Sequence, residues 1–280
     1  MKNSLVIMVG GASSRMKRSL EHSLLDEDIK KVAEKHHKSL IPLGEEGRPL
    51  LFYLVQNAAK AGITTIYLIT GSDNQIFKDF IDSLRRNSDF EGLDIKIAIQ
   101  NLWPGKTKPL GTADALLQCL EQYNELLQEQ FTVCNGDNLY EVQDFKVLSN
   151  PRKISNALIA YKGSALGYGL EKYLKFALLD FNEEHFLTGI IEKPTTEEVD
   201  AYKEKHETHW VSMNIFNLNG AFIYPFLKEC KIHPVRGEKE LPEAVRNAIK
   251  KWPNSFLCIP RSSKIPDLTS AEDISKFKIK

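Results

Sequence analysis

The sequence lacks a net charge. Its 280 residues contain 37 lysines and arginines against 37 aspartates and glutamates, so the formal charge at pH 7 is zero. A chain without a basic excess has no long-range attraction for nucleic acid or for an anionic membrane surface. We therefore expect no nucleic-acid partner and no membrane partner, although the composition still permits a local basic pocket.

Cysteine pairs and long apolar runs are also missing. The four cysteines, at positions 119, 134, 230 and 258, show no CxxC spacing, so neither a zinc site nor a redox motif is indicated. They are expected to be buried reduced thiols. No stretch approaches the length of a membrane span, and the first residues begin a strand rather than a signal peptide. We expect a soluble, cytoplasmic protein.

What the sequence does contain is a short apolar run that ends in very small residues. Leu5 to Val9 predicts a buried parallel strand because it is short and rich in β-branched side chains. The residues Gly10 to Ser14 have small side chains or none, so their backbone N–H groups can approach a ligand closely. Consecutive N–H groups form an anion nest, and Arg15 adds a forked cation suited to phosphate oxygens. GGASSR is neither the Walker pattern nor GxGxxG, and an ordinary strand-to-helix turn is the alternative.

Strand-like and helix-like stretches alternate through the first half of the chain. After the first strand, helices are predicted at 48–61, 74–86 and 112–128, and strands at 65–70, 95–99 and 131–134. This alternation favours a parallel sheet with helices on both faces. Ligands of such sheets bind beyond the carboxyl ends of the strands, where the Gly10 loop would lie.

The second half of the chain has shorter spacers between its predicted strands. These strands are at 157–161, 175–181 and 186–192, and a further strand in HWVSMNIFNLNG leads into a helix at 220–229. We expect them to be antiparallel additions to the same sheet. No repeat or linker interrupts the pattern. Residues 1–280 are therefore assigned to a single α/β domain with a mixed, mostly parallel sheet.

A helical insertion at 18–37 separates the small loop from Lys38. Acid-first charge pairs at i,i+4 and an apolar stripe indicate a solvated amphipathic helix. A packed surface helix and a lid over the loop both agree with this pattern. His36 and His37 adjoin Lys38, and we expect both to be solvated because neighbouring side chains point in different directions.

Two later motifs place charged side chains at the ends of predicted strands. In FTVCNGDNLY, Asp137 follows an apolar strand, and one or two carboxylates with substrate phosphates commonly hold Mg²⁺. An Asx turn is the alternative there. In GIIEKP, a strand delivers Glu192 and Lys193 before Pro194 ends the pairing. Lys193 is suited to a phosphate, and an exposed strand end is the alternative.

Taken in order, these motifs resemble those of the sugar-1-phosphate nucleotidyltransferases, also called nucleotide-sugar pyrophosphorylases. The resemblance covers nearly the whole chain. The loop of that family resembles GGxGTRL, followed by a lysine in a segment that ends in proline; here GGASSRM is followed by KSLIPL, which begins at Lys38. The family pairs a glutamine with a GTA or GLA segment, and here Gln100 precedes PLGTADALL. A Tyr168-Gly169 pair precedes EKP, and Asp267 takes the place of the aspartate in the pattern D-x-G-T-x-E-D.

The sequence departs from this family at several positions. Ser13 replaces the third glycine, so the loop is similar to the GGxSSRMG of the molybdenum-cofactor guanylyltransferases, although EKP and GTADAL do not fit those shorter chains. Ser270 stands where a glycine-threonine pair is usual after Asp267. The insertion before Lys38 is longer than in the simplest members. No left-handed β-helix domain is expected after Asp267.

The resemblance implies a Rossmann-like nucleotidyltransferase fold and a reaction of NTP with sugar 1-phosphate to give NDP-sugar and pyrophosphate. Mg²⁺ is the implied cofactor. A phosphate oxygen is already a nucleophile at neutral pH, so positioning and charge neutralisation would carry the catalysis. The implied catalytic side chains are Arg15 at the departing pyrophosphate, Lys38 at the α-phosphate and Lys193 at the sugar phosphate.

The implied binding sites use the remaining motifs. The nucleotide would be held by Gly10, Gly11, Ala12, Ser13, Ser14, Gln100, Gly111 and Thr112. The sugar phosphate would be held by Tyr168, Gly169, Glu192 and Lys193, and Mg²⁺ by Asp137 and Asp267. NTP and sugar 1-phosphate are the expected partners, and the resemblance leaves room for a homo-oligomer. The sequence does not fix the base or the sugar.

Three other functions share parts of this pattern. A nucleotide-diphospho-sugar glycosyltransferase shares the fold and the metal aspartate, but it usually presents DxD rather than NGDNL. A sensor that binds nucleotide or sugar phosphate without turnover agrees with the departures at Ser13 and Ser270, whereas the retained Arg15, Lys38 and Asp137 argue against it. The third is a related transferase that uses a non-sugar phosphate such as phosphocholine.

Overall fold

A ten-stranded sheet forms the centre of the computed structural model, which describes residues 3–11, 13–21, 23, 27–35, 37–169 and 175–277. The strand order is β5-β4-β1-β6-β11-β7-β10-β8-β9, and β12 also pairs with β7. The strands are β1 (Ser4–Met8), β4 (Thr65–Thr70), β5 (Asp94–Ile99), β6 (Gln130–Asn135), β7 (Asn156–Lys162), β8 (Ala177–Phe181), β9 (Leu187–Glu192), β10 (Trp210–Ser212), β11 (Ile215–Asn219) and β12 (Phe256–Arg261). A separate small sheet pairs β2 (Pro42–Leu43) with β3 (Arg48–Pro49).

The direction of the strands changes along the sheet. Strands β5, β4, β1 and β6 run parallel to one another. Strand β11 is antiparallel to both β6 and β7, and β7, β10, β8 and β9 then alternate in direction. The predicted antiparallel additions in the second half of the chain are confirmed.

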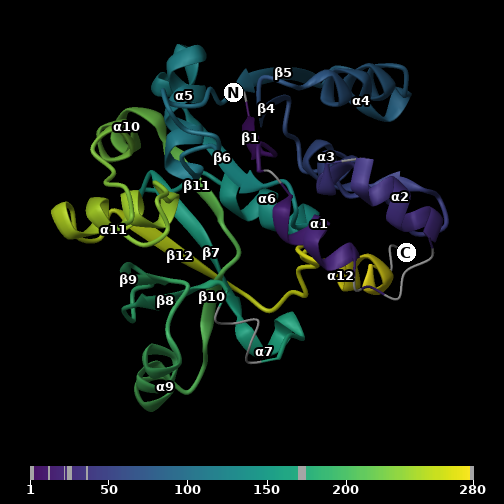
Figure 1. Ribbon diagram of the computed structural model, residues 1–280. Helices are drawn as coiled ribbons and strands as arrows, with labels where there is room; N and C mark the ends of the chain where they lie inside the picture. The colour runs from purple at the N-terminus through teal and green to yellow at the C-terminus, as the bar shows by residue number, and fades with distance from the viewer. Residues whose placement is uncertain are drawn as a thin grey trace.

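Helices cover both faces of the sheet. Leu5 and Ile7 of β1 belong to one buried cluster and Val6 to the other, as expected for a strand whose alternate side chains point to opposite faces. One face is covered by α3 (Leu50–Lys60), α4 (Gln75–Arg85) and α6 (Val142–Ser149), the other by α5 (Thr112–Gln122), α10 (Gly220–Lys228) and α11 (Leu241–Lys251). In Figure 1, α10 and α11 lie on one side of the strands and α3 on the other. The predicted mixed α/β sheet is confirmed.

Three predicted elements differ in detail. The helix predicted from residue 48 begins at Leu50, because β3 occupies the two residues before it. The long helix predicted at 112–128 ends at Gln122 and is followed by the 3₁₀ helix η3 (Asn124–Gln128). The single strand predicted in HWVSMNIFNLNG is wrong: β10 and β11 are separate, because Asn214 has a φ of 55°, a left-handed conformation that ends a strand.

The remaining elements surround this sheet. The insertion 18–37 contains the end of α1 (Ser14–Leu20) and the helix α2 (Glu27–Lys35), while residues 22, 24–26 and 36 lie outside the described residues. Leu20 and Ala33 are buried in the core, so both helices pack against the protein. A lid role for the insertion stays a prediction. The other short elements are η1 (Lys38–Leu40), η2 (Ser88–Phe90), α7 (Gly163–Leu166), α9 (Thr196–Lys205) and α12 (Ala271–Lys276).

Two further expectations concern composition. The four cysteines are free and buried, as predicted. None of the helices in the described residues has the length and apolar character needed to cross a lipid bilayer. The cytoplasmic location and the assignment of 1–280 to a single domain stay predictions.

Candidate active site

A cavity of about 530 Å³ lies beyond the carboxyl ends of β1 and β6. Its wall includes most of the residues predicted to form the site. These are Gly10, Gly11, Ser13, Arg15, Lys38, Gln100, Gly111, Thr112, Asp137, Glu192, Lys193 and Asp267. The fold therefore gathers motifs from the whole length of the chain into one cavity.

Four predicted site residues are not part of this wall as described. Ala12 and the side chain of Ser14 lie outside what the structure describes. Tyr168 and Gly169 are absent from the described wall; the Tyr168 hydroxyl donates a hydrogen bond to the carbonyl of Ile265 at 2.6 Å, and its ring lies 5.8 Å from that of Phe176. The proposed contact of Tyr168 and Gly169 with a sugar stays a prediction.

The small loop after β1 leaves its backbone open toward the cavity. A Cβ on Gly10 would come no closer than 3.5 Å to the described protein, and one on Gly11 would meet nothing within 4 Å. Packing among the described residues therefore does not require glycine at either position. A Cβ there would instead stand between a ligand and the backbone N–H groups, which supports the predicted role of the loop.

Ser13 has a backbone conformation that favours glycine, the residue in its place in the family pattern. Its φ of 52° is left-handed, which a residue with a side chain adopts at a cost. The Ser13 hydroxyl oxygen accepts a hydrogen bond from the backbone N–H of Lys38 at 3.2 Å. The serine thus joins the loop to the segment that carries the predicted catalytic lysine.

His37 provides a second connection between these segments, and the expectation that it is solvated is wrong. Its Nε2 lies 2.8 Å from the carbonyl oxygen of Gly11, and its Nδ1 lies 2.8 Å from the hydroxyl of Ser39. Because a carbonyl oxygen only accepts, Nε2 carries the proton and Nδ1 is the acceptor. Burial lowers the pKa of His37 to about 4, so the ring is neutral at physiological pH.

We expect His37 to destabilise the folded protein in mild acid. Between its folded pKa of about 4 and its ordinary value of 6.5, the unfolded chain binds more protons, so the free energy of unfolding falls as pH decreases through this range. Urea unfolding from pH 4.5 to 8 should show a steeper dependence for the wild type than for His37→Gln. The glutamine places an N–H near the position of Nε2 but does not titrate. Equal slopes for the two proteins would contradict this assignment.

Lys38 and Asp137 form an ion pair inside the cavity. Lys38 Nζ contacts Asp137 Oδ2, and each side chain is 16% exposed. Lys38 begins η1, and Asp137 follows β6. A phosphate that binds Lys38 would therefore replace Asp137 as its partner and leave the carboxylate available to a cation.

Asp267 lies beside the Asp137 segment although about 130 residues separate them. Asn138 and Asp267 form an isolated β-bridge, and the backbone N–H of Leu268 donates to the carbonyl of Asp137 at 2.8 Å. The Asp267 carboxylate accepts hydrogen bonds from Asn138 Nδ2 at 3.1 Å and from the Thr269 hydroxyl at 2.7 Å. Thr269 thus supports the carboxylate at a place where the family pattern has a glycine.

This pair of aspartates fits a magnesium ion that also binds substrate phosphates. No set of three or more His, Cys, Asp or Glu side chains within the described residues could hold a metal by itself. Mg²⁺ is usually bound by one or two carboxylates together with substrate phosphates and water, which is the donor set that Asp137 and Asp267 offer. The site would thus be completed by the substrate.

A buried carboxylate fixes the orientation of the Gln100 side chain. Gln100 Nε2 donates to the Gly111 carbonyl at 3.1 Å and to Asp114 Oδ2 at 2.9 Å. The fully buried Asp114 also accepts from Gln118 Nε2 at 2.9 Å and from Trp103 Nε1 at 2.8 Å. Because both acceptors of Gln100 can only accept, its amide N–H groups are used, and the oxygen Oε1 is left facing the Gly10 loop. A base that reaches Gln100 must therefore donate a hydrogen bond to it.

Thr112 and Ala113 hydrogen-bond to the chain at the end of the segment 233–240, where Gly111 packs closely against it. The Lys239 carbonyl accepts from the backbone N–H of Ala113 at 2.9 Å, and the Thr112 hydroxyl accepts from the N–H of Leu241 at 2.9 Å. A Cβ on Gly111 would lie 2.5 Å from the Lys239 carbonyl oxygen, and its φ of 107° is one that other residues rarely adopt. Glycine is required here by this contact.

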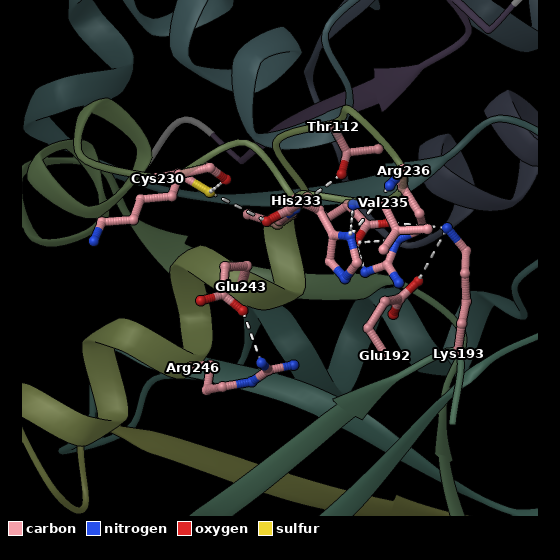
Figure 2. A network of polar contacts seen from close by, with 12 residues as sticks. Thr112, Glu192, Lys193, Cys230, His233, Val235, Arg236, Glu243 and Arg246 are labelled. Carbon is pink, nitrogen blue, oxygen red and sulfur yellow. Dashed lines mark hydrogen bonds and ion pairs between the residues drawn. The ribbon is translucent and has the colours of Figure 1, made fainter. Parts of the chain in front are cut away.

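Glu240, at the end of the segment 233–240, lies beside Lys193. Lys193 Nζ lies 2.7 Å from Glu240 Oε1 and 3.9 Å from Glu192 Oε1. The Arg236 guanidinium also binds both Glu240 oxygens, with its Nε at 3.1 and 3.0 Å. Figure 2 shows Lys193 and Arg236 converging beside Glu192. The predicted sugar-phosphate lysine is therefore already paired with a carboxylate.

Glu192 has an unusual environment. Burial raises its pKa to about 7, with Lys193 lowering the pKa and Glu240 raising it. Its second oxygen, Oε2, is buried and has no hydrogen-bond partner among the described residues. A ligand hydroxyl would satisfy this oxygen.

A known protein family matches most of the chain. The family described as Nucleotidyl transferase matches residues 29–261. The chain belongs to the nucleotidyl transferase family. The match includes Lys38, Asp137 and Lys193, whereas the Gly10 loop and Asp267 lie outside it. The family membership predicted from the motifs is confirmed.

Individual relatives of this nucleotidyl transferase are distant. The glucose-1-phosphate adenylyltransferase of Clostridium novyi (strain NT) is 24% identical over 231 residues, which are 80% of this chain and 52% of the relative. The bifunctional protein GlmU of Staphylococcus epidermidis is 22% identical over 252 residues, 89% of this chain and 46% of the relative. The chain thus spans about half the length of these curated relatives.

A solved structure of UDP-glucose pyrophosphorylase complexed with UDP-glucose has the same fold. Its TM-score is 0.69 at 17% identity, and the match covers 99% of this chain and 97% of the other. At this identity the comparison concerns the fold alone. The Rossmann-like nucleotidyltransferase fold predicted from the resemblance is confirmed.

Several residues of this candidate site were not predicted. Asn214 and Glu240 are on the cavity wall, and Asp114 lies behind Gln100. Asp114 stands inside the GTADAL motif. Its place close to Gly111 and Thr112, which were predicted to bind the nucleotide, could have identified it from the sequence. The other two occur in stretches without a recognisable motif, and only the packing of β10 and of the segment 233–240 brings them to the cavity.

Proposed function

We propose that the protein transfers a nucleotidyl group from an NTP to a sugar 1-phosphate, with Mg²⁺, to give an NDP-sugar and pyrophosphate. The observation that carries this proposal is that one cavity joins the Gly10 loop, the Asp137–Asp267 pair and Lys193. A phosphate oxygen of the acceptor attacks the α-phosphorus. A new P–O bond forms as the bond from the α-phosphorus to the bridging oxygen breaks, and pyrophosphate leaves with that electron pair.

The residues of the cavity would act mainly by placing charge. The backbone of Gly10 and Gly11 binds the triphosphate, and Arg15 neutralises the departing pyrophosphate. When the substrates bind, Lys38 leaves its ion pair with Asp137 and contacts the α-phosphate. Lys193 likewise leaves Glu240 and contacts the sugar phosphate. When bound to Asp137 and Asp267, Mg²⁺ neutralises phosphate charge. No proton has to be removed from the attacking oxygen.

The decisive experiment is pyrophosphate release with Mg²⁺ across five NTPs and a panel of sugar 1-phosphates, with phosphocholine included. Release that requires one particular NTP and one sugar 1-phosphate would support the proposal and identify both substrates. Release with phosphocholine alone would favour the non-sugar alternative. Binding of NTP without any release would favour the sensor.

A variant of Asp114 tests the proposed base site. An asparagine that keeps its bond to Trp103 would turn its NH₂ toward the amide of Gln100, so Gln100 would no longer present only its oxygen. We expect Asp114→Asn to weaken NTP binding by about tenfold, a typical effect of one hydrogen bond. Binding of inorganic tripolyphosphate, which has no base, should be unchanged in the same titration calorimetry.

Gln118→Ala is the matched control for this variant. It removes another donor to the same Asp114 carboxylate, while Gln118 is not on the described cavity wall. It should leave NTP binding close to that of the wild type. Equal losses for NTP and tripolyphosphate in Asp114→Asn would instead indicate a general disturbance of the loop.

A further inference from the structure

The small loop after β1 has little in its own sequence to fix its backbone. Gly10 and Gly11 have no side chains, and a Cβ on Gly11 would meet nothing within 4 Å. Glycine loses more conformational freedom on folding than any other residue, so a binding loop made of glycine must be held by contacts from elsewhere. The direction of the Gly11 carbonyl is important, because a carbonyl oxygen turned into the cavity would repel the oxygens of a phosphate.

His37 holds this carbonyl from outside the loop. Its Nε2 lies 2.8 Å from the Gly11 carbonyl oxygen and donates to it. The ring centroid of His37 lies 5.3 Å from that of Phe77, a buried residue of α4, with an angle of 58° between the ring planes. The imidazole is therefore packed against the core of the protein, and it directs the Gly11 carbonyl toward itself.

The same side chain fixes the start of the segment that carries Lys38. His37 is the N-cap of η1, because its Nδ1 accepts from the backbone N–H of Ser39 at 3.3 Å, and it also lies 2.8 Å from the Ser39 hydroxyl. The His37 carbonyl accepts from the N–H of Leu40 at 2.8 Å. Lys38 lies between these contacts, so one imidazole ring sets the position of the lysine relative to the small loop.

The His37 ring has no N–H left for a substrate, although it is part of the cavity wall. A neutral imidazole has one donor and one acceptor; here Gly11 occupies the donor and Ser39 the acceptor. Burial lowers the pKa of His37, so the second nitrogen is not protonated at physiological pH. Any effect of His37 on a bound phosphate is therefore transmitted through the backbone that the ring holds.

We propose that His37 is a positioning residue for the triphosphate, which keeps the Gly11 carbonyl turned away from the phosphates and holds Lys38 in place beside the small loop. This inference rests on the proposed function and adds a residue to it, because His37 lies just outside the KSLIPL motif that begins at Lys38. Its effect should be confined to the NTP, since the sugar 1-phosphate is assigned to Lys193 and not to the small loop.

Two amide side chains separate the two contacts of the ring. The amide nitrogen in His37→Gln can reach the place of imidazole Nε2 and donate to Gly11, whereas the shorter amide in His37→Asn reaches only the place of Nδ1. We expect His37→Asn to weaken the binding of inorganic tripolyphosphate with Mg²⁺ by about tenfold and His37→Gln to stay within about twofold of the wild type. Titration calorimetry measures both affinities.

Steady-state kinetics of the same variants gives a second readout, because a general loss of folding would affect both substrates. The KM for NTP should rise about tenfold in His37→Asn and be restored in His37→Gln, while the KM for the sugar 1-phosphate stays within about twofold in both.

His206→Asn is the matched control. His206 Nε2 lies 2.9 Å from Asp180 Oδ1, so the same substitution breaks a similar contact at a histidine that is not on the described cavity wall. It should bind tripolyphosphate like the wild type. Equal tripolyphosphate affinities of His37→Gln and His37→Asn would overturn the inference, as would equal losses for NTP and sugar 1-phosphate. If the wild type binds tripolyphosphate but releases no pyrophosphate, the proposed function fails, and the calorimetric comparison still decides the role of His37.

Discussion

Asp137→Asn should lower the rate of pyrophosphate release by about a thousandfold, the upper range for removing one preorganised electrostatic contact from an active site. The carboxylate is 16% exposed and lies between Lys38 and the Asp267 segment. Its loss would leave a single carboxylate for the cation. Asparagine preserves the size of the side chain, so the melting temperature should stay within a few degrees of the wild type. Single-turnover release at saturating NTP, acceptor and Mg²⁺ measures the effect.

Asp82→Asn is the control for this variant. Asp82 is exposed and paired with Arg85 at 3.0 Å, and it is not on the described cavity wall. It should release pyrophosphate at the wild-type rate. A second readout is the Mg²⁺ concentration that gives half the maximal rate, which should rise in Asp137→Asn only. Turnover within tenfold of the wild type at ordinary Mg²⁺ would show that Asp137 is not a metal ligand.

Lys193→Ala should lower kcat/KM for the sugar 1-phosphate by about a hundredfold. Hydrogen bonds to charged groups contribute about 1.5–3 kcal/mol, which is roughly tenfold to a hundredfold. The upper end is expected because the variant also leaves Glu240 facing the phosphate without its lysine partner, which adds repulsion. The KM for NTP should change little. Steady-state kinetics with each substrate varied in turn measures the two effects.

Lys203→Ala is the matched control for the lysine. Lys203 lies on α9 and forms an ion pair with Asp200 at 2.9 Å, with side chains that are 36% and 60% exposed. Such a surface pair contributes little to stability, so neither kinetic constant should move. A Lys193→Ala enzyme that loses affinity equally for NTP and for sugar 1-phosphate would contradict the assignment of Lys193 to the acceptor.

The parts of the fold that the sequence predicts well are those with a strong local pattern. The strand Thr65–Thr70 has the predicted bounds because it is a compact apolar run after a glycine turn. Asp137 is found in the cavity because a residue that follows a parallel strand lies at the edge of the sheet where ligands bind. For such residues, the local motif alone predicts where the side chain lies in the fold.

Other parts of the site depend on contacts that no local pattern contains. Glu240 reaches Lys193 because the backbone of Lys239 pairs with that of Leu110 and Ala113, a contact between distant segments. Asn214 is on the wall because its left-handed backbone separates β10 from β11, whereas HWVSMNIFNLNG was predicted to form one strand. His37 was expected in solvent because adjacent side chains point in different directions, and its hydrogen bond to Gly11, 26 residues away, follows no local pattern.

The pair of contacts that Ser13 and His37 make also bears on how much the segment between them can vary in length. The chain leaves the small loop after β1 at Ser13 and returns at Lys38, and the two points are hydrogen-bonded to each other. Extending a loop whose ends are already held together costs only about 0.6 kcal/mol for each doubling of its length. Segments of very different length can therefore be accommodated between these two residues while the loop and Lys38 keep their places. Among homologous chains, we expect differences in length to be concentrated between these two residues rather than in the loop or around Lys38.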